Sequence, residues 1–157
     1  KYDFFFMGTY LPERYNALKK FNNTYGQTYS IKNYIYIPNS SLIKERLKGT
    51  KLDMDICTTD HLAYDEYLKT LACSRVMVDV SNKKQTGLAM RIIEALKVKV
   101  ATNNKFILNE PYYNPNNITV FSPENPIIAS SFISTPFIGT VSTLSVEQWL
   151  DAIFSDK

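Results

Sequence analysis

Residues 75–102 read RVMVDVSNKKQTGLAMRIIEALKVKVAT and fall into three parts. Arg75–Val80 is an apolar run typical of a buried strand, and Val98–Thr102 is a second such run. Between them, apolar residues recur at helical spacing, which predicts a helix over Gly87–Lys97. A strand, a helix and another strand in one short stretch are typical of two parallel strands joined by a crossover helix.

The rest of the chain continues this alternation. Further strands are predicted at residues 2–10, 33–37 and 118–121, and further helices at residues 12–21, 41–47, 61–73 and 144–155, with Asp60 and Ser145 as caps of the last two. A short helix or turn is expected at residues 103–110, an irregular connection at 49–59 and a long ordered connection at 122–143. The sequence therefore predicts an α/β fold, a Rossmann-like three-layer sandwich with a mostly parallel sheet.

The composition is that of one globular domain. The chain has 157 residues, which is long enough to bury a core without disulfides or metals. Its net charge of +3 comes from scattered basic residues, which argues against nucleic acid as a partner. Two cysteines and one histidine, without paired metal-ligand spacing, argue against a structural zinc site and suit reduced thiols. No apolar run is long enough for a membrane span.

The first residues suggest a piece of a longer protein. The chain begins at Lys1 without an initiator Met and almost at once enters a strand-like run. We therefore expect residues 1–157 to form a single domain whose amino-terminal neighbour is missing.

The first candidate site follows the first predicted strand. Ligands of open parallel sheets bind beyond the carboxyl ends of the strands. Gly8 and Thr9 end this strand, and a glycine there lets a ligand approach the backbone closely. Arg14, in the following helix, can pair with two oxygens of a diphosphate. From the local pattern alone, a plain turn at Gly8 and a solvated Arg14 remain open.

The second candidate site follows the strand at Arg75–Val80. Thr86 and Gly87, at the start of the predicted helix, can offer a hydroxyl and backbone N–H groups to a phosphate. Arg91, or the two lysines before Thr86, can balance its charge. Glu94 suits the two hydroxyls of a ribose, but spacing alone favours a solvated Glu94 or an ion pair with Arg91.

Other catalytic motifs are missing from the sequence. It has no GxGxxG for a nicotinamide cofactor, no GxxxxGK[ST] for a phosphate-binding loop and no GxSxG for a serine hydrolase. His61, Asp53 and Asp55 lack further ligands or partners in the sequence, and capping or surface roles are expected for them.

Residues 78–103 resemble the carboxy-terminal domain of GT-B glycosyltransferases. The most specific part is QTGLAMRIIEAL at residues 85–96, followed by a strand ending in Thr102-Asn103. This part is similar to bacterial lipopolysaccharide and capsular polysaccharide biosynthesis proteins. Phe6-Met7-Gly8, with Pro12 and Arg14, also resembles the start of such domains, so the resemblance covers roughly residues 2–122.

The resemblance implies one half of a GT-B fold, in which two Rossmann-like domains enclose the active site. It implies that Glu94 binds the nucleotide ribose and that Gln85, Thr86 and Gly87 approach the phosphates or the donor sugar. Many retaining members have a second glutamate where this chain has Thr86. Donor binding in the family needs no obligatory metal, so neither a metal nor another cofactor is expected.

The implied function is donor binding in a glycosyltransferase. The domain would bind a nucleotide-diphosphate sugar for transfer to a growing lipopolysaccharide or capsular polysaccharide. The glycan or lipid-linked acceptor would be held by the missing amino-terminal domain, so the present chain alone is expected to be inactive. The full-length protein would be cytoplasmic and could associate with the inner face of the membrane. Two alternatives stay open: half of a GT-B-type sugar-nucleotide epimerase, and a non-catalytic α/β interaction module.

Overall fold

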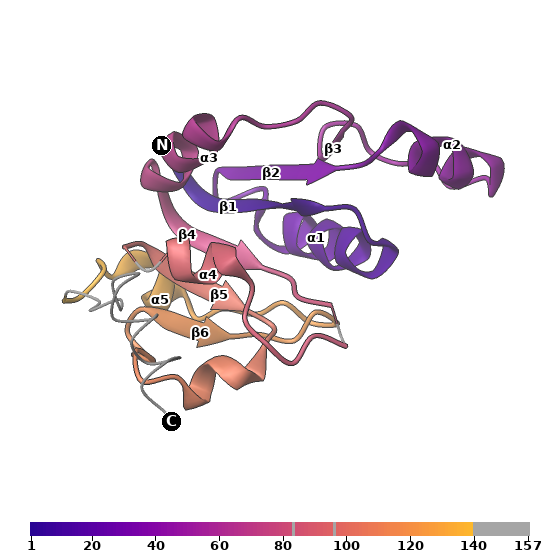
Figure 1. Ribbon diagram of the computed structural model, residues 1–157. Coiled ribbons are helices and arrows are strands. Elements are labelled where there is room, and N and C mark those ends of the chain that lie inside the picture. The colour runs from indigo at the N-terminus through magenta and orange to yellow at the C-terminus, as the bar shows by residue number, and fades with distance from the viewer. Residues whose placement is uncertain (83, 96, 140–157) are drawn as a thin grey trace, which may run out of the picture.

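A computed structural model describes residues 1–82, 84–95 and 97–139. Within them, all strands pair in parallel in one sheet of order β3-β2-β1-β4-β5-β6 (Figure 1). The strands are β1 (Tyr2–Thr9), β2 (Ile31–Tyr36), β3 (Cys57–Thr58), β4 (Ser74–Asp79), β5 (Lys99–Thr102) and β6 (Ile118–Val120). The helices are α1 (Pro12–Tyr25), α2 (Asn39–Leu47), α3 (Tyr64–Ala72), α4 (Met90–Glu94), the 3₁₀ helix η1 (Lys105–Asn109) and α5 (Ser130–Ser134). This confirms the predicted Rossmann-like α/β fold.

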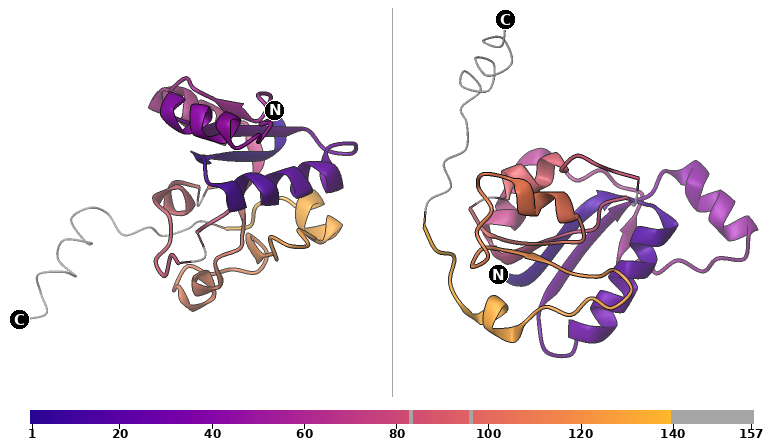
Figure 2. Two further views of the ribbon diagram at one scale, coloured as in Figure 1. Left: turned by 90° about the vertical axis from the view of Figure 1, so that its right-hand side faces the viewer. Right: turned by 90° about the horizontal axis from the view of Figure 1, so that it is seen from below.

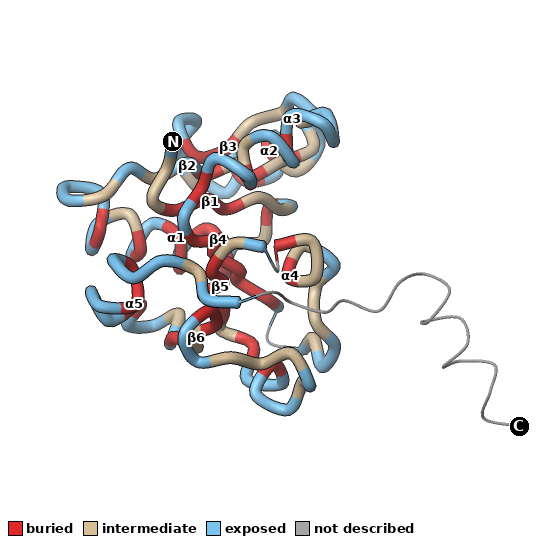
Figure 3. The backbone as a smooth tube through the Cα atoms, turned by 90° about the vertical axis from the view of Figure 1, so that its left-hand side faces the viewer, coloured by how far each residue is buried: buried red, intermediate tan, exposed pale blue. Residues whose placement is uncertain are grey.

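The central strand β1 explains why the sheet is covered on both faces. Its residues Phe4, Phe5 and Phe6 alternate between the faces, and each is at most 1% exposed. Parallel strands buried on both faces have such unbroken apolar runs. The burial colouring of Figure 3 accordingly shows the strands as the buried centre of the molecule.

Two hydrophobic clusters mark the two helical layers (Figure 2). One cluster joins Phe4 and Phe6 to residues of α1 and α5. The other joins Phe5 to residues of α3, α4 and η1. α1 and α5 therefore cover one face of the sheet, and α3, α4 and η1 cover the other. The strand order reverses between β1 and β4, and such a reversal leaves a crevice at the carboxyl ends of these strands.

The predicted strands agree with the structure to within two residues. One strand among the described residues was not predicted. Cys57–Thr58 forms β3 at the edge of the sheet, inside the stretch expected to be irregular. Two residues are too few to give a periodic signal, and only the pairing with β2 defines this strand. The short helix expected at residues 103–110 is η1, where the Asn104 side chain accepts a hydrogen bond from the Phe106 N–H.

Two predicted helices start later than expected. α3 begins at Tyr64, and its N-terminal neighbour Ala63 provides no side-chain cap, so the prediction of Asp60 as a cap was wrong. α4 is limited to Met90–Glu94, and Ala89 before it is extended. The Asn104 side chain donates to the Gly87 carbonyl at 3.0 Å and holds this segment outside the helix. Gln85, Thr86 and Gly87 are therefore in a loop and do not form the helix start.

The segment around α5 packs against β5. Lys99 is 2% exposed, and its Nζ donates to the Phe132 carbonyl and to Thr135 Oγ1, which ties α5 to the sheet. Burial lowers the pKa of Lys99. The helix predicted at residues 144–155, with its cap Ser145, lies outside the described residues.

Candidate functional site

The carboxyl ends of β1 and β4 form the centre of the candidate site. From β1 the chain crosses towards β2, and from β4 it crosses towards β5, in the opposite direction. Ligands of open α/β sheets bind in the crevice that such a divergence leaves. Gly8 and Thr9 lie at the end of β1, and Asp79 lies at the end of β4.

Arg14 spans this crevice from the first turn of α1. Its Nε donates to the Val80 carbonyl at 2.8 Å, and its Nη1 donates to the Thr9 carbonyl. The residue is 8% exposed. Burial, followed by the nearby Arg91, lowers the pKa of Arg14 to about 10, while Asp79 acts in the opposite direction. The alternative of a solvated Arg14 is therefore excluded.

Gly8 makes room for the Phe6 ring, beside which this guanidinium group lies. A Cβ atom at Gly8 would lie 3.0 Å from Phe6 Cζ and 3.5 Å from Arg14 Nη1. The first distance is shorter than ordinary contact, so either the Phe6 ring or the backbone would have to move. The glycine is therefore needed for close approach of side chains to the strand, which is more than a plain turn requires.

Asp79 ends β4, on the other side of the crevice, and accepts hydrogen bonds from three side chains there. It is fully buried, and its Oδ2 accepts hydrogen bonds from Ser81 Oγ and Thr102 Oγ1, each at 2.7 Å. Arg91 Nε donates to Asp79 Oδ1 at 2.7 Å. Arg91 Nη2 lies 2.7 Å from the same oxygen but is not aligned for a hydrogen bond. This buried Nη2 is therefore ion-paired with Asp79 and has no aligned hydrogen-bond acceptor.

The two guanidinium groups lie close to one aromatic ring. Arg14 Cζ is 5.9 Å and Arg91 Cζ is 5.8 Å from the centroid of the Phe6 ring. Both distances are within the range of cation–π attraction, which helps to hold two positive charges in a mostly buried region. Since Asp79 compensates only one of them, these three groups carry a net charge of +1.

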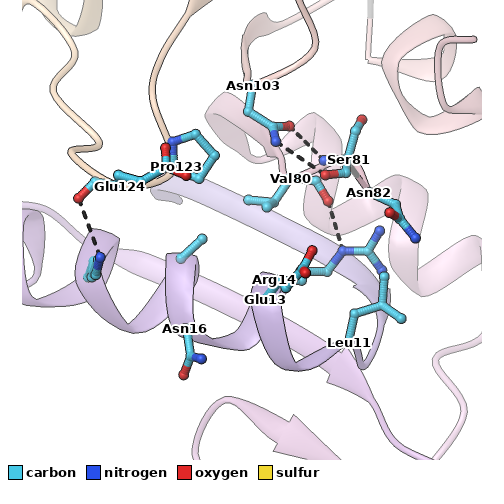
Figure 4. Close-up of a pocket in the computed structure, with 12 residues that line it drawn as sticks. Leu11, Glu13, Arg14, Asn16, Val80, Ser81, Asn82, Asn103, Pro123 and Glu124 are labelled. Carbon is cyan, nitrogen blue, oxygen red and sulfur yellow. Dashed lines mark hydrogen bonds between the residues drawn. The ribbon is translucent and has the colours of Figure 1, made fainter. Parts of the chain in front are cut away.

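A pocket of about 180 Å³ opens beside Arg14, between α1 and the loops that follow β4, β5 and β6 (Figure 4). Asn103 holds the loop that follows β4 in place. Its side chain accepts a hydrogen bond from the Ser81 N–H at 2.7 Å and donates one to the Ser81 carbonyl at 3.1 Å. Leu11, Ala17, Val80 and Pro123 give the lining apolar surface. Polar and charged side chains also line it, namely Glu13, Arg14, Asn16, Lys20, Ser81, Asn82, Asn103 and Glu124. The pocket therefore offers a ligand both apolar surface and hydrogen-bonding groups.

The loop residues of the second candidate site lie outside this pocket. Of the predicted site residues, only Arg14 lines it, so Gly8, Thr9 and Arg91 lie outside it as Gln85, Thr86 and Gly87 do. Thr86 and Gly87 are exposed, and the Gln85 N–H donates to the Asn82 carbonyl. The structure thus brings Gly8, Thr9, Arg14 and Arg91 together and leaves these three residues in the neighbouring loop.

Glu94 lies one helical turn beyond Arg91 and faces α3. Its Oε1 accepts from Tyr64 Oη at 3.2 Å, and its Oε2 accepts from Tyr67 Oη at 2.9 Å. Burial and this carboxylate raise the pKa of Tyr67. Glu94 is therefore neither simply solvated nor paired with Arg91, whose partner is Asp79.

Asp79 is the residue of the site whose role the sequence did not reveal. A carboxylate that ends an otherwise apolar strand was a usable signal, since such a group needs buried partners.

His61 is exposed and lies against Tyr36, with ring centroids 4.1 Å apart. Among the described residues, no cluster of three or more His, Cys, Asp or Glu side chains could hold a metal ion.

Comparison with protein-family models, curated proteins and solved structures gives no match to this chain. The function must therefore be argued from the site and from the sequence resemblance. No helix within the described part of the chain has the length and apolar character to cross a membrane.

Proposed function

We propose that this domain binds the diphosphate of a donor sugar nucleotide at the carboxyl edge of β1 and β4, as the donor half of a GT-B-type glycosyltransferase. The supporting observation is the pair Arg14 and Arg91 around Phe6, with one compensating carboxylate, Asp79. Guanidinium groups match phosphate oxygens in both charge and geometry. Arg14 is too buried to meet a flat protein surface, which favours a ligand that enters the pocket.

In the proposed reaction, the two arginines act on the leaving group. Transfer of the sugar leaves negative charge on the nucleoside diphosphate, and fixed positive groups in a site with little water stabilise that charge. Arg91 Nη2 is buried beside Asp79 and has no aligned hydrogen-bond acceptor. The acceptor, a glycan or lipid-linked saccharide of lipopolysaccharide or capsule synthesis, and the catalytic base belong to a second domain. We therefore expect no sugar transfer by this chain alone.

A thermal-shift panel of UDP, GDP, CDP, ADP and CMP tests the proposal. A ligand at a hundred times its dissociation constant stabilises the folded state by about 2.7 kcal/mol, so a binder gives a clear rise in Tm. We expect at least one diphosphate to raise Tm more than CMP does, because two phosphates engage both arginines. No response to any of the five nucleotides would instead support a non-catalytic interaction module.

Arg14→Gln is the matching variant. It removes the charge at the pocket, and we expect the affinity for the binding diphosphate to fall about ten- to a hundredfold, as for loss of charge-assisted hydrogen bonds. Lys19→Gln is the control, because Lys19 is exposed on the same helix and does not line the pocket. Equal affinities of the two variants would remove Arg14 from the binding site.

A further inference from the structure

The pocket beside Arg14 extends along α1, away from the crevice between β1 and β4. Of the two arginines that flank Phe6, Arg14 lines the pocket and Arg91 does not. Figure 4 shows Arg14 and Asn82 at one end of the pocket and Pro123, in the loop after β6, at the other. A ligand that binds the Arg14 guanidinium can therefore continue along α1 into this space.

The size of the pocket suits one sugar ring. Its volume is about 180 Å³. At about 30 Å³ for each water molecule of the liquid, such a volume holds about six waters. A hexose ring fits into this space, whereas a nucleoside, which joins a base to a ribose, is too large for it. The pocket therefore matches the sugar end of a sugar nucleotide better than its base.

The lining also has the two kinds of surface that a sugar ring needs. Ala17 and Val80 are buried and give it an apolar wall, against which the C–H groups of a ring can pack. Glu13 and Asn82 are exposed. Within the described part of the chain, the Glu13 carboxylate and the Asn82 Nδ2 group have no hydrogen-bond partner, while Asn82 Oδ1 accepts from the Lys84 N–H. A carboxylate acceptor and an amide donor are thus available for ring hydroxyls.

The order of these groups across the carboxyl edge sets the direction of the ligand. α4, with Arg91 and Glu94, covers one face of the sheet, and α1, with Arg14, covers the other. A sugar nucleotide with its ribose on the α4 side and its diphosphate at the two arginines has its sugar on the α1 side. The pocket lies on that side.

We propose that the donor sugar occupies this pocket on the α1 side, where Glu13 and Asn82 bind its hydroxyls and select the sugar. The inference rests on the proposed diphosphate site, because Arg14 belongs to both. It differs from what the sequence resemblance implies, which is that residues 85–87 approach the phosphates or the donor sugar. Those three residues do not line the pocket.

Calorimetric titration of the 157-residue chain with two ligands tests the inference. The ligands are the diphosphate that gives the largest thermal shift and its glucose ester, for example UDP and UDP-glucose. Glu13→Gln should lower the affinity for the glucose ester about tenfold, and Asn82→Ala about fivefold, because each loses a hydrogen bond to a hydroxyl. Neither variant should change the affinity for the diphosphate. Glu66→Gln is the matched control, since Glu66 is also exposed in the first turn of a helix but does not line the pocket.

The two ligands also separate this inference from the proposed function. If the diphosphate binds but Glu13→Gln and Asn82→Ala leave the affinity for the glucose ester unchanged, or weaken both ligands equally, the sugar pocket is wrong and the diphosphate site stands. If neither ligand binds the wild-type chain, both proposals fail.

Amide chemical shifts locate the sugar independently of the variants. We expect the spectra of the chain saturated with the diphosphate and with its glucose ester to differ most at Ala17 and Asn82, which line the pocket. Thr86 and Gly87, which do not line it, should show little difference. Differences confined to Thr86 and Gly87 would place the sugar at that loop and overturn the proposal.

Discussion

At the scale of single residues, the site depends on how its charges are compensated. Asp79 is buried completely, and its three side-chain partners come from the β4 loop, from α4 and from β5. Sequence patterns identified Gly8 and Arg14, because both lie near the end of an obvious strand. They did not assign a role to Asp79, because Thr102 and Arg91 come near it only after β5 and α4 have packed against β4.

Asp79→Asn is predicted to destabilise the fold. The substitution keeps the size of the side chain but leaves Arg91 without its compensating charge, and breaking a buried pair of this kind costs about 3 kcal/mol. Urea unfolding followed by circular dichroism measures this loss as a lower transition midpoint. Asp55→Asn, at an exposed position, is the control and should leave the midpoint unchanged. A similar midpoint for Asp79→Asn and wild type would show that the pair contributes little.

At the scale of helices and strands, prediction succeeded where apolar runs were long. The strands β1 and β4 have such runs. It failed for the start of α4, because the apolar spacing continues through residues 87–89 although Asn104 binds the Gly87 carbonyl. A hydrogen bond from a side chain seventeen positions away leaves no local periodic signal.

The contact between α3 and α4 allows a test of Glu94. The sequence resemblance implies that Glu94 accepts hydrogen bonds from the ribose, and in the structure Tyr64 Oη donates to its Oε1. Tyr64 is 61% exposed, so a ligand can displace it. We expect Glu94→Ala to lower the affinity for the binding nucleotide and Tyr64→Phe to leave it equal or higher, as measured by isothermal titration calorimetry. If Glu94→Ala changes only the unfolding midpoint, Glu94 is a link between helices and does not bind ribose.

At the scale of the whole molecule, the sheet order determines where the site lies. Alternating strands and helices predicted a parallel sheet, but the order β3-β2-β1-β4-β5-β6 could not be predicted from local patterns. It depends on how the right-handed crossover connections place each strand beside another. This order makes β1 and β4 neighbours, and only for that reason do Arg14 and Arg91 meet near Phe6.

The central claim is that this carboxyl edge binds a nucleoside diphosphate. An amide chemical-shift map of the isotope-labelled chain, recorded during titration with the diphosphate that gives the largest thermal shift, tests it most directly. We predict the largest changes at Thr9, Arg14 and Ser81, and small changes at Ser74 at the opposite end of β4. Changes confined to the opposite edge, or no changes with any of the diphosphates, would contradict the claim.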